Sequence, residues 1–410
     1  MPAIAFLRKN AIAGKPSFCY LALNTPHSPM QVPDAYWRRF EGATLELTGG
    51  EKEDVGHTRA ALSMCENIDD NVGRLLAALR EGGLDRETIV VYFSDNGPNG
   101  PRWNGGMKGR KGSTDEGGVR SPLLLRWPAK VRPGTVITPV AAAVDLYPTL
   151  IDLAGVARAG DRPFDGISLA PWLLGEDAPT PDRVLFQHWA GRVSARDQRF
   201  RLDATGKLFD LTSDPGQQRD VAADHPEVTG RLADAAGRWR REVLGELPGS
   251  DGRPFPVGFA EFPRAVLPAR DGVAHAGVKR SASAPNCSFF THWTKPDDRM
   301  TWEVEVNAAG RYEAIVHYTC PEPEVGSLIE MTLGEVSWGG TIAPPHDPPL
   351  RGAERDRVSR GGESYVKDFR PLSLGIAELP AGKATLTLRA TRVAGTQVAD
   401  IRSVELVLVP

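Results

Sequence analysis

The spacing of the apolar residues changes close to residue 260, and this change divides the chain between two fold classes. Before it, short apolar runs of strand length alternate with stretches in which apolar residues recur at helical spacing. After it, apolar and polar residues alternate with a period of two, and turns separate the runs. We therefore expect an α/β region followed by an all-β sandwich.

Five segments define the α/β region. The runs 17–23 and 88–93 are typical of strands that are covered on both faces. A helix with one apolar face over residues 65–79, ended by Gly82 and Gly83, precedes the second run, and a strand at 123–127 and a helix at 145–155 follow it. This alternation favours a mixed or parallel sheet between helices.

The chain of 410 residues is long enough for more than one domain. Residues 1–182 carry the α/β pattern. Residues 183–247 predict a small α+β subdomain, with short strands near 199–202 and 207–211 and a helix near 228–244. Residues 248–262 are rich in Pro and Gly and read as a linker, and residues 263–410 are expected to form the β-sandwich.

Composition and cysteine spacing exclude several classes of protein. A formal net charge of -3 argues against nucleic-acid binding, because such proteins usually carry a clear basic excess. The four cysteines show no C-x-x-C spacing, which favours buried free thiols over disulfides. No apolar run approaches the roughly 18 to 20 residues of a membrane span. The first residues read as the end of an amphipathic helix and not as a signal peptide.

The strongest candidate for chemistry is the pair Asp95 and Asn96, which follows the apolar run 88–93 directly. Ligand sites of open α/β sheets lie at the carboxyl ends of strands, and these two residues offer hard oxygen ligands there. The alternative is a plain turn that ends the strand, with Asn96 and Gly97 as turn residues.

Two further residues are candidates for binding an oxyanion. His27 follows the run 17–23 and could bind an oxyanion or donate a proton to a leaving oxygen, although a loop histidine can equally be structural or solvated. Lys111 lies in the glycine-rich loop 105–120, whose backbone can approach a sulfate or phosphate closely. Lys108 and Arg110 are expected to be solvent-facing or rim charges.

Five motifs follow one another along the chain: YLALNTPHSP at 20–29, SDNG at 94–97, KGSTDEGGVRSP at 111–122, DLYPTL at 145–150 and LFDLTSDP at 208–215. They occur in the order found in the type I sulfatases, the arylsulfatase-like enzymes of the alkaline phosphatase superfamily, and the chain resembles that family over residues 1–245. The resemblance implies hydrolysis of a sulfate ester at a site with one Ca²⁺ ion. It would make Asp95 and Asn96 calcium ligands, Lys111 a sulfate-binding cation and His27 a contact to the sulfate or the leaving oxygen.

One departure from the family is severe. The family nucleophile is a cysteine in Cys-x-Pro/Ala-x-Arg that is matured to formylglycine, and none of the four cysteines has this context. We therefore expect a fragment that is truncated at its N-terminus and has little or no sulfatase activity alone. The resemblance implies a sulfated carbohydrate or an aryl sulfate ester as substrate, and a periplasmic or secreted location, while the chain shows no signal peptide.

Two alternatives remain open. The first is a phosphate or phosphonate monoester hydrolase of the same superfamily, although Asn96 suits calcium better than zinc. The second is a truncated, non-catalytic protein that binds glycans, because the C-terminal region resembles carbohydrate-binding modules. Trp293, Trp338 and Tyr365 could stack on sugar rings there, or they could pack in the core.

Overall fold

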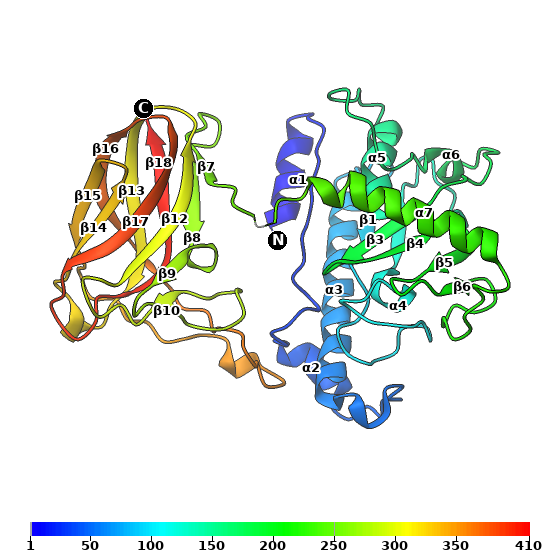
Figure 1. Ribbon diagram of the computed structural model, residues 1–410, viewed down its shortest axis with the longest axis horizontal. Helices are drawn as coiled ribbons and strands as arrows, with labels where there is room; N and C mark the ends of the chain where they lie inside the picture. The colour runs from blue at the N-terminus through cyan, green and yellow to red at the C-terminus, as the bar shows by residue number, and fades with distance from the viewer. Residues whose placement is uncertain (1, 250) are drawn as a thin grey trace. The chain divides into compact units, whose positions relative to one another are not determined.

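The computed structural model describes residues 2–249 and 251–410, which form two compact units (Figure 1). The first unit holds the chain up to Asn24 together with Gly42–Leu247, and the second holds Thr25–Glu41 together with Pro248–Pro410. Hydrophobic core clusters form within each unit. The segment Thr25–Glu41, which carries α2 (Asp34–Phe40), therefore belongs with the C-terminal part of the chain.

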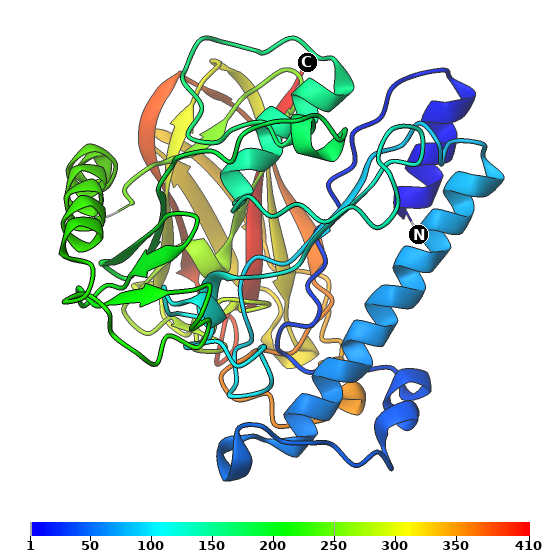
Figure 2. The same ribbon diagram turned by 90° about the vertical axis from the view of Figure 1, so that its right-hand side faces the viewer.

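The helices of the first unit are led by α3 (Val55–Glu81), which Figure 2 shows as one long helix. It begins where the carboxylate of Asp54 accepts a hydrogen bond of 2.8 Å from the backbone N–H of His57, and it is capped by Gly82. Ile68 and Leu79 of the predicted apolar face are buried, whereas Cys65 of that face is exposed. The other helices are α1 (Pro2–Ile12), α4 (Glu116–Val119), α5 (Leu146–Ala154), α6 (Ala170–Leu173) and α7 (Pro226–Glu242).

Two strands of the first unit, β1 (Val90–Phe93) and β2 (Leu123–Arg126), pair with each other. They are antiparallel, with Phe93 opposite Leu123, whereas the alternation of the sequence favoured parallel neighbours. The chain between them forms loops and the short helix α4, and it returns to β1 directly in the opposite direction. The predicted positions of both strands and the α/β class of this region are confirmed.

The strand predicted for residues 17–23 is wrong. These residues form an irregular segment, in which Phe18 is 78% and Tyr20 72% exposed. A strand needs a neighbour for its N–H and C=O groups, and none of the strands that the structure describes pairs with this run. The apolar pattern indicates a segment suited to burial, but it does not identify the partner that would bury it.

A four-stranded antiparallel sheet and α7 form the end of the first unit. The strands follow in chain order, β3 (Leu185–Trp189), β4 (Arg192–Arg196), β5 (Phe200–Leu202) and β6 (Leu208–Asp210). Apolar side chains of the sheet pack with Leu232 and Ala236 of α7 in one core. The predicted strands near 199–202 and 207–211 and the helix near 228–244 are confirmed.

The second unit contains two six-stranded sheets, which share one core as an all-β sandwich (Figure 1). One sheet holds β8 (Arg264–Pro268), β10 (Lys279–Arg280), β11 (Phe290–Thr291), β13 (Gly310–Thr319), β16 (Arg370–Leu379) and β18 (Asp400–Val409). The other holds β7 (Phe255–Val257), β9 (Val273–His275), β12 (Arg299–Val306), β14 (Leu328–Leu333), β15 (Val336–Thr341) and β17 (Gly382–Arg392). The strand β7 lies inside the stretch that its composition predicted as a linker, and it pairs in parallel with β12.

The aromatic residues considered for sugar stacking are mostly inside this sandwich. Trp293 is 0% and Trp338 3% exposed, so the stacking role is wrong for both and the alternative of core packing is confirmed. Tyr365 is half-buried, and the guanidinium of Arg360 lies 3.8 Å from the centre of its ring. The ring therefore already has a cationic neighbour within its own unit.

All four cysteines are free thiols. Cys320 is buried, whereas Cys19 and Cys65 are exposed where the sequence predicted burial. Among the helices of residues 2–249 and 251–410, none is both long enough and apolar enough to cross a membrane.

Candidate functional site

The loop that follows β1 and the glycine-rich loop are joined by their backbones. Gly97 permits this approach, because a Cβ atom at this position would lie 1.9 Å from the carbonyl oxygen of Gly117. The pairing places the segment after Phe93 beside the segment that carries Lys111. The hydrogen bonds run from Gly97 N to Gly118 O at 3.0 Å, from Lys111 N to Pro98 O at 2.9 Å, and from Ser121 Oγ to Ser94 O at 2.6 Å.

Asp95 and Asn96 lie at the carboxyl end of β1, as the sequence predicted. The carboxylate of Asp95 is exposed, and among residues 2–249 and 251–410 it has no hydrogen bond or ion pair. The amide Nδ2 of Asn96 donates to the carbonyl oxygen of Gly97 at 2.9 Å. This bond uses one of the two N–H donors of the amide and leaves its oxygen Oδ1 available, so the turn presents a carboxylate and an amide oxygen that have no protein partner among the described residues.

Lys111 and Lys108 differ in their surroundings. Lys111 is half-buried, and its ammonium has no ion pair or hydrogen bond in the part of the chain that the structure describes. The ammonium of Lys108 lies 3.3 Å from Asp115, 3.2 Å from Asp203 and 4.8 Å from the ring centre of Phe209. Lys108 is therefore a paired structural cation, which corrects the expectation of a rim charge.

The pKa of Lys108 agrees with this pairing. Burial alone would lower the pKa of its ammonium, but the carboxylates of Asp115 and Asp203 outweigh burial and raise the pKa above its ordinary value. Lys108 thus stays charged and committed to two carboxylates. Lys111, in contrast, is half-buried and has no protein partner among the described residues, so its ammonium is available to bind an external anion.

His27 lies in a different unit from the other candidate site residues. It belongs to the segment Thr25–Glu41 of the second unit, whereas Asp95, Asn96 and Lys111 belong to the first. The side chain is exposed, and Nδ1 lies 2.7 Å from the carbonyl oxygen of Ser28. Its predicted contact to an oxyanion or a leaving oxygen remains a prediction.

Asp95 and Asn96 are residue types that bind calcium, but the two of them provide fewer ligands than a calcium site needs. Calcium takes six to eight oxygen ligands, and carboxylate and amide oxygens such as those of Asp95 and Asn96 are its usual protein donors. Across residues 2–249 and 251–410, no group of three or more His, Cys, Asp and Glu side chains is placed to hold a metal ion. Asp95 and Asn96 therefore offer oxygens of the type that calcium takes, but fewer ligands than calcium needs.

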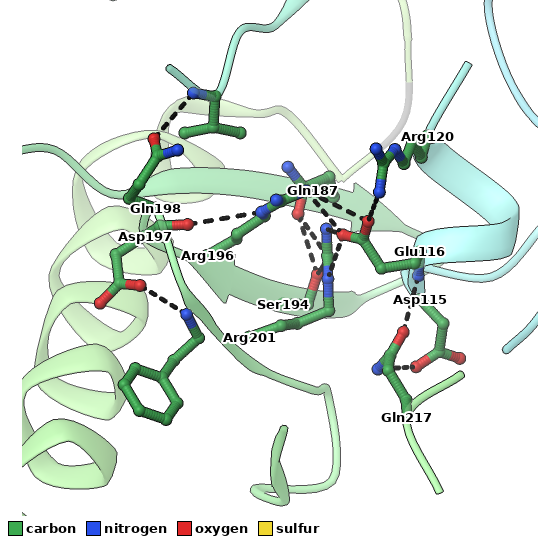
Figure 3. A network of polar contacts seen from close by, with 12 residues as sticks. Asp115, Glu116, Arg120, Gln187, Ser194, Arg196, Asp197, Gln198, Arg201 and Gln217 are labelled. Atoms are coloured by element: carbon green, nitrogen blue, oxygen red, sulfur yellow. Dashed lines mark hydrogen bonds and ion pairs between the residues drawn. The ribbon is translucent and has the colours of Figure 1, made fainter. Parts of the chain in front are cut away.

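Sequence reasoning missed the residues that hold the glycine-rich loop in place (Figure 3). Glu116 is 0% and Arg201 1% exposed, and they form an ion pair of 2.7 Å between α4 and β5. The single signal for this pair in the sequence is an arginine that stands inside a short apolar strand, between Phe200 and Leu202. Such a residue needs a buried anion as partner.

Two family models match the N-terminal part of the chain, up to residue 234. Residues 2–156 match the model described as Sulfatase, and residues 111–234 match the model described as N-sulphoglucosamine sulphohydrolase, C-terminal. The two matches overlap over residues 111–156, a stretch that begins in the glycine-rich loop and includes β2 and α5. Together they contain Asp95, Asn96 and Lys111 as well as Glu116 and Arg201.

Curated relatives and solved structures agree with these matches. Steryl-sulfatase of Mus musculus is 35% identical over 233 residues, which cover 45% of this chain and 37% of the relative. Arylsulfatase A of Bos taurus is 32% identical over 252 residues, which cover 52% of this chain and 46% of the relative. The solved structure of Ps i-CgsB in complex with k-i-k-neocarrahexaose is 27% identical, covers 58% of this chain and 53% of that one, and has a TM-score of 0.51. The chain thus spans less than half the length of these two curated relatives.

Proposed function

Because this chain belongs to the sulfatase family through residues 2–234, we propose that its first unit binds the sulfate group of the sulfate esters that this family hydrolyses. The proposed substrate is a sulfated carbohydrate or an aryl sulfate ester. The ligand k-i-k-neocarrahexaose in the similar solved structure supports a carbohydrate. We also propose a periplasmic or secreted location, as the resemblance to type I sulfatases implied.

One observation carries this proposal. The backbone hydrogen bond of 2.9 Å from Lys111 N to Pro98 O joins the loop of the unpaired cation to the loop of the two unpaired oxygens. Asp95 and Asn96 lie just before Pro98 in that second loop. A sulfate group carries negative oxygens that suit an ammonium, and a metal ion held by the two oxygen donors would take up the remaining charge.

Asp95 and Asn96 would hold the calcium ion, through the carboxylate and through Oδ1 of the amide. When bound, the ion would supply a positive charge that stabilises the negative charge developing on the sulfate ester. The hydrogen bond from Asn96 Nδ2 to Gly97 O keeps the amide in the orientation that exposes its oxygen. The ammonium of Lys111 would bind and orient the sulfate from the glycine-rich loop.

We further propose that this chain binds sulfate esters without turning them over. None of its four cysteines lies in a Cys-x-Pro/Ala-x-Arg motif, which the family nucleophile requires. Cys320 is buried in the second unit, where burial raises the pKa of its thiol to about 11, so it is protonated and a poor nucleophile at neutral pH. The residues of the first unit would then serve recognition, and nucleophilic attack would need a group outside this sequence.

Binding measurements on matched esters test the proposal. Calorimetric titration of the chain with 4-nitrophenyl sulfate and 4-nitrophenyl phosphate, with calcium and with a chelator, should show preference for the sulfate ester and weaker binding when calcium is removed. A preference for the phosphate ester would favour the phosphate or phosphonate monoester hydrolase instead. Release of 4-nitrophenol from the sulfate ester by this chain would contradict the proposed lack of turnover.

A further inference from the structure

The carboxylate of Glu116 is enclosed by guanidinium groups from the four-stranded sheet (Figure 3). Arg201 reaches its Oε1 with Nη2 at 2.7 Å and with Nε at 3.1 Å. Arg196 Nη1 lies 2.9 Å from Oε1 and 3.1 Å from Oε2. The side chains of Glu116 and Arg201 are both 1% exposed, so water does not compete for these bonds.

The same guanidinium also holds the backbone of the loop before Glu116. Arg201 Nη1 donates to the carbonyl oxygen of Thr114 at 2.7 Å, and Ser194 Oγ donates to the same oxygen at 2.8 Å. Arg201 Nη1 further contacts Ser194 Oγ at 2.9 Å and Gln187 Oε1 at 2.8 Å. One planar guanidinium with five donors therefore fixes a side chain and a main-chain oxygen of the loop at once.

Additional bonds from the same part of the first unit continue along the loop on both sides of Lys111. They are directed at main-chain atoms and at charged side chains, and they leave the Lys111 ammonium without a partner among the described residues. These bonds therefore fix the backbone of the loop and leave the Lys111 ammonium available to bind an anion. These bonds are Gln217 Oε1 with Glu116 N at 2.8 Å, Arg192 Nη2 with Gly112 O at 2.7 Å, and Lys108 Nζ with Asp203 at 3.2 Å.

The energetics favour a geometric role for the Glu116 and Arg201 pair. A buried ion pair is costly to desolvate, and apolar residues of similar volume often stabilise a core as well or better. Such a pair does fix the relative orientation of its two residues, because a guanidinium and a carboxylate meet in few orientations. In this protein the fixed orientation restrains the backbone at Glu116, five residues after Lys111.

We infer that Glu116 and Arg201 are positioning residues for anion binding: they lock the glycine-rich loop onto the four-stranded sheet, so that the Lys111 ammonium is held ready for an oxyanion. The anion is a sulfate group, and in this respect the inference rests on the proposed function. Neither residue touches the sulfate. Both act through the placement of the loop, whose second attachment is the backbone bond from Lys111 N to Pro98 O.

Arg201→Gln is the decisive variant, and Arg199→Gln is its matched control. Arg199 lies just before β5 and pairs with Asp210 at 2.7 Å, so its loss does not touch the loop. Arg201→Gln should raise hydrogen exchange of the backbone amides of residues 108–118 at least tenfold, while those of α3 and of the second unit keep their rates. It should also weaken binding of a sulfated disaccharide about tenfold, whereas Arg199→Gln should change neither quantity.

Ser194→Ala provides a milder test should Arg201→Gln fail to fold, because it removes one of the two bonds to Thr114 O and leaves the ion pair intact. For Ser194→Ala we expect a two- to fivefold rise in hydrogen exchange of the loop amides and a similar loss of affinity for the sulfated disaccharide. Unchanged exchange in a folded variant overturns the inference, as does faster exchange with unchanged affinity. If the wild-type chain binds no sulfated ligand while the loop responds as described, positioning of the loop stands and the proposed function fails.

Discussion

Arg183 donates to both carboxylate oxygens of Asp145, at 2.6 and 2.7 Å, at the start of α5. The carboxylate also accepts hydrogen bonds from the backbone N–H groups of Ala142 at 2.7 Å and of Ile167 at 2.9 Å, so it binds three other residues of the chain. Burial would raise the pKa of Asp145, but the bonds from Arg183 and from the two N–H groups outweigh it and hold the pKa below its ordinary value. Asp145 is therefore ionised and fully paired at neutral pH.

Asp145→Asn should destabilise the first unit strongly, because Arg183 would lose the partner of a charge that is largely removed from water. Breaking a buried pair by removing one partner costs about 3–5 kcal/mol. Urea unfolding of the first unit, followed by circular dichroism, measures this difference. Asp152→Asn in the same helix is the control: Asp152 is exposed and bonds Ser168 at 2.6 Å, and its change should stay within about 0.5 kcal/mol. Equal effects of the two variants would show that the Asp145 carboxylate has no special role.

Acid should weaken the first unit in part through Asp210. The hydrogen bond from Arg199 at 2.7 Å, helped by the backbone N–H of Thr212, lowers the pKa of Asp210 from 3.8 to about 2 in the folded protein. Because the folded pKa lies below the unfolded one, the contribution of Asp210 to stability is complete above about pH 4 and is lost as the pH falls towards about 2.

Asp210→Asn should remove this part of the pH dependence. The free energy of unfolding of the wild-type protein, measured in urea at a series of pH values from 5 to 2, should exceed that of the variant at the upper end and converge with it at the lower end. Asp234→Asn, at an exposed position of α7, should follow the wild-type curve. A constant difference between wild type and Asp210→Asn at every pH would contradict the assignment.

Lys111→Met should weaken binding of sulfated ligands without affecting stability. A hydrogen bond to a charged group contributes about 1.5–3 kcal/mol, which corresponds to roughly a 10- to 150-fold loss of affinity. Lys111 has no protein partner among the described residues, so its loss should leave thermal unfolding unchanged. Arg110→Met, next to it and exposed, is the control and should retain most of the affinity. Titration calorimetry with a sulfated disaccharide and its unsulfated parent distinguishes the two variants.

The elements of the first unit that local sequence determines are the ones that could be predicted. Gly82 ends α3, and Gly155, with φ of +63°, ends α5, where a glycine adopts the left-handed conformation easily. Asp95 and Asn96 could also be placed, because the end of an apolar strand is visible in sequence. These predictions depend on residues that are close together in the chain.

The predictions that failed depend on distant partners. The run 17–23 is apolar enough for a strand, but which strand would pair with it is not encoded within the run. Lys108 was expected at the rim, and one of its two carboxylate partners, Asp203, is 95 residues away. Glu116 and Arg201 are 85 residues apart, so neither could be identified as half of a buried pair from its own neighbourhood. Packing in three dimensions determines these contacts.

Gly97→Ala tests the contact between the two loops of the candidate site. The added Cβ atom would lie 1.9 Å from the carbonyl oxygen of Gly117, so the loops must separate and the bond from Gly97 N to Gly118 O is lost. Overpacking of this kind costs about 1–3 kcal/mol, and we expect a loss of that size together with weaker binding of sulfated ligands.

Gly73→Ala is the control, and we expect it to change the stability of the protein in the opposite direction. Gly73 lies within α3, and a Cβ atom there meets nothing within 4 Å, so alanine should stabilise the helix by about 0.5–1 kcal/mol. Thermal unfolding and sulfate titration of both variants separate general stability from the geometry of the loops. If Gly97→Ala kept the affinity of the wild type, the close approach of the two loops would be unnecessary for anion binding, and the site would have to lie elsewhere in the first unit.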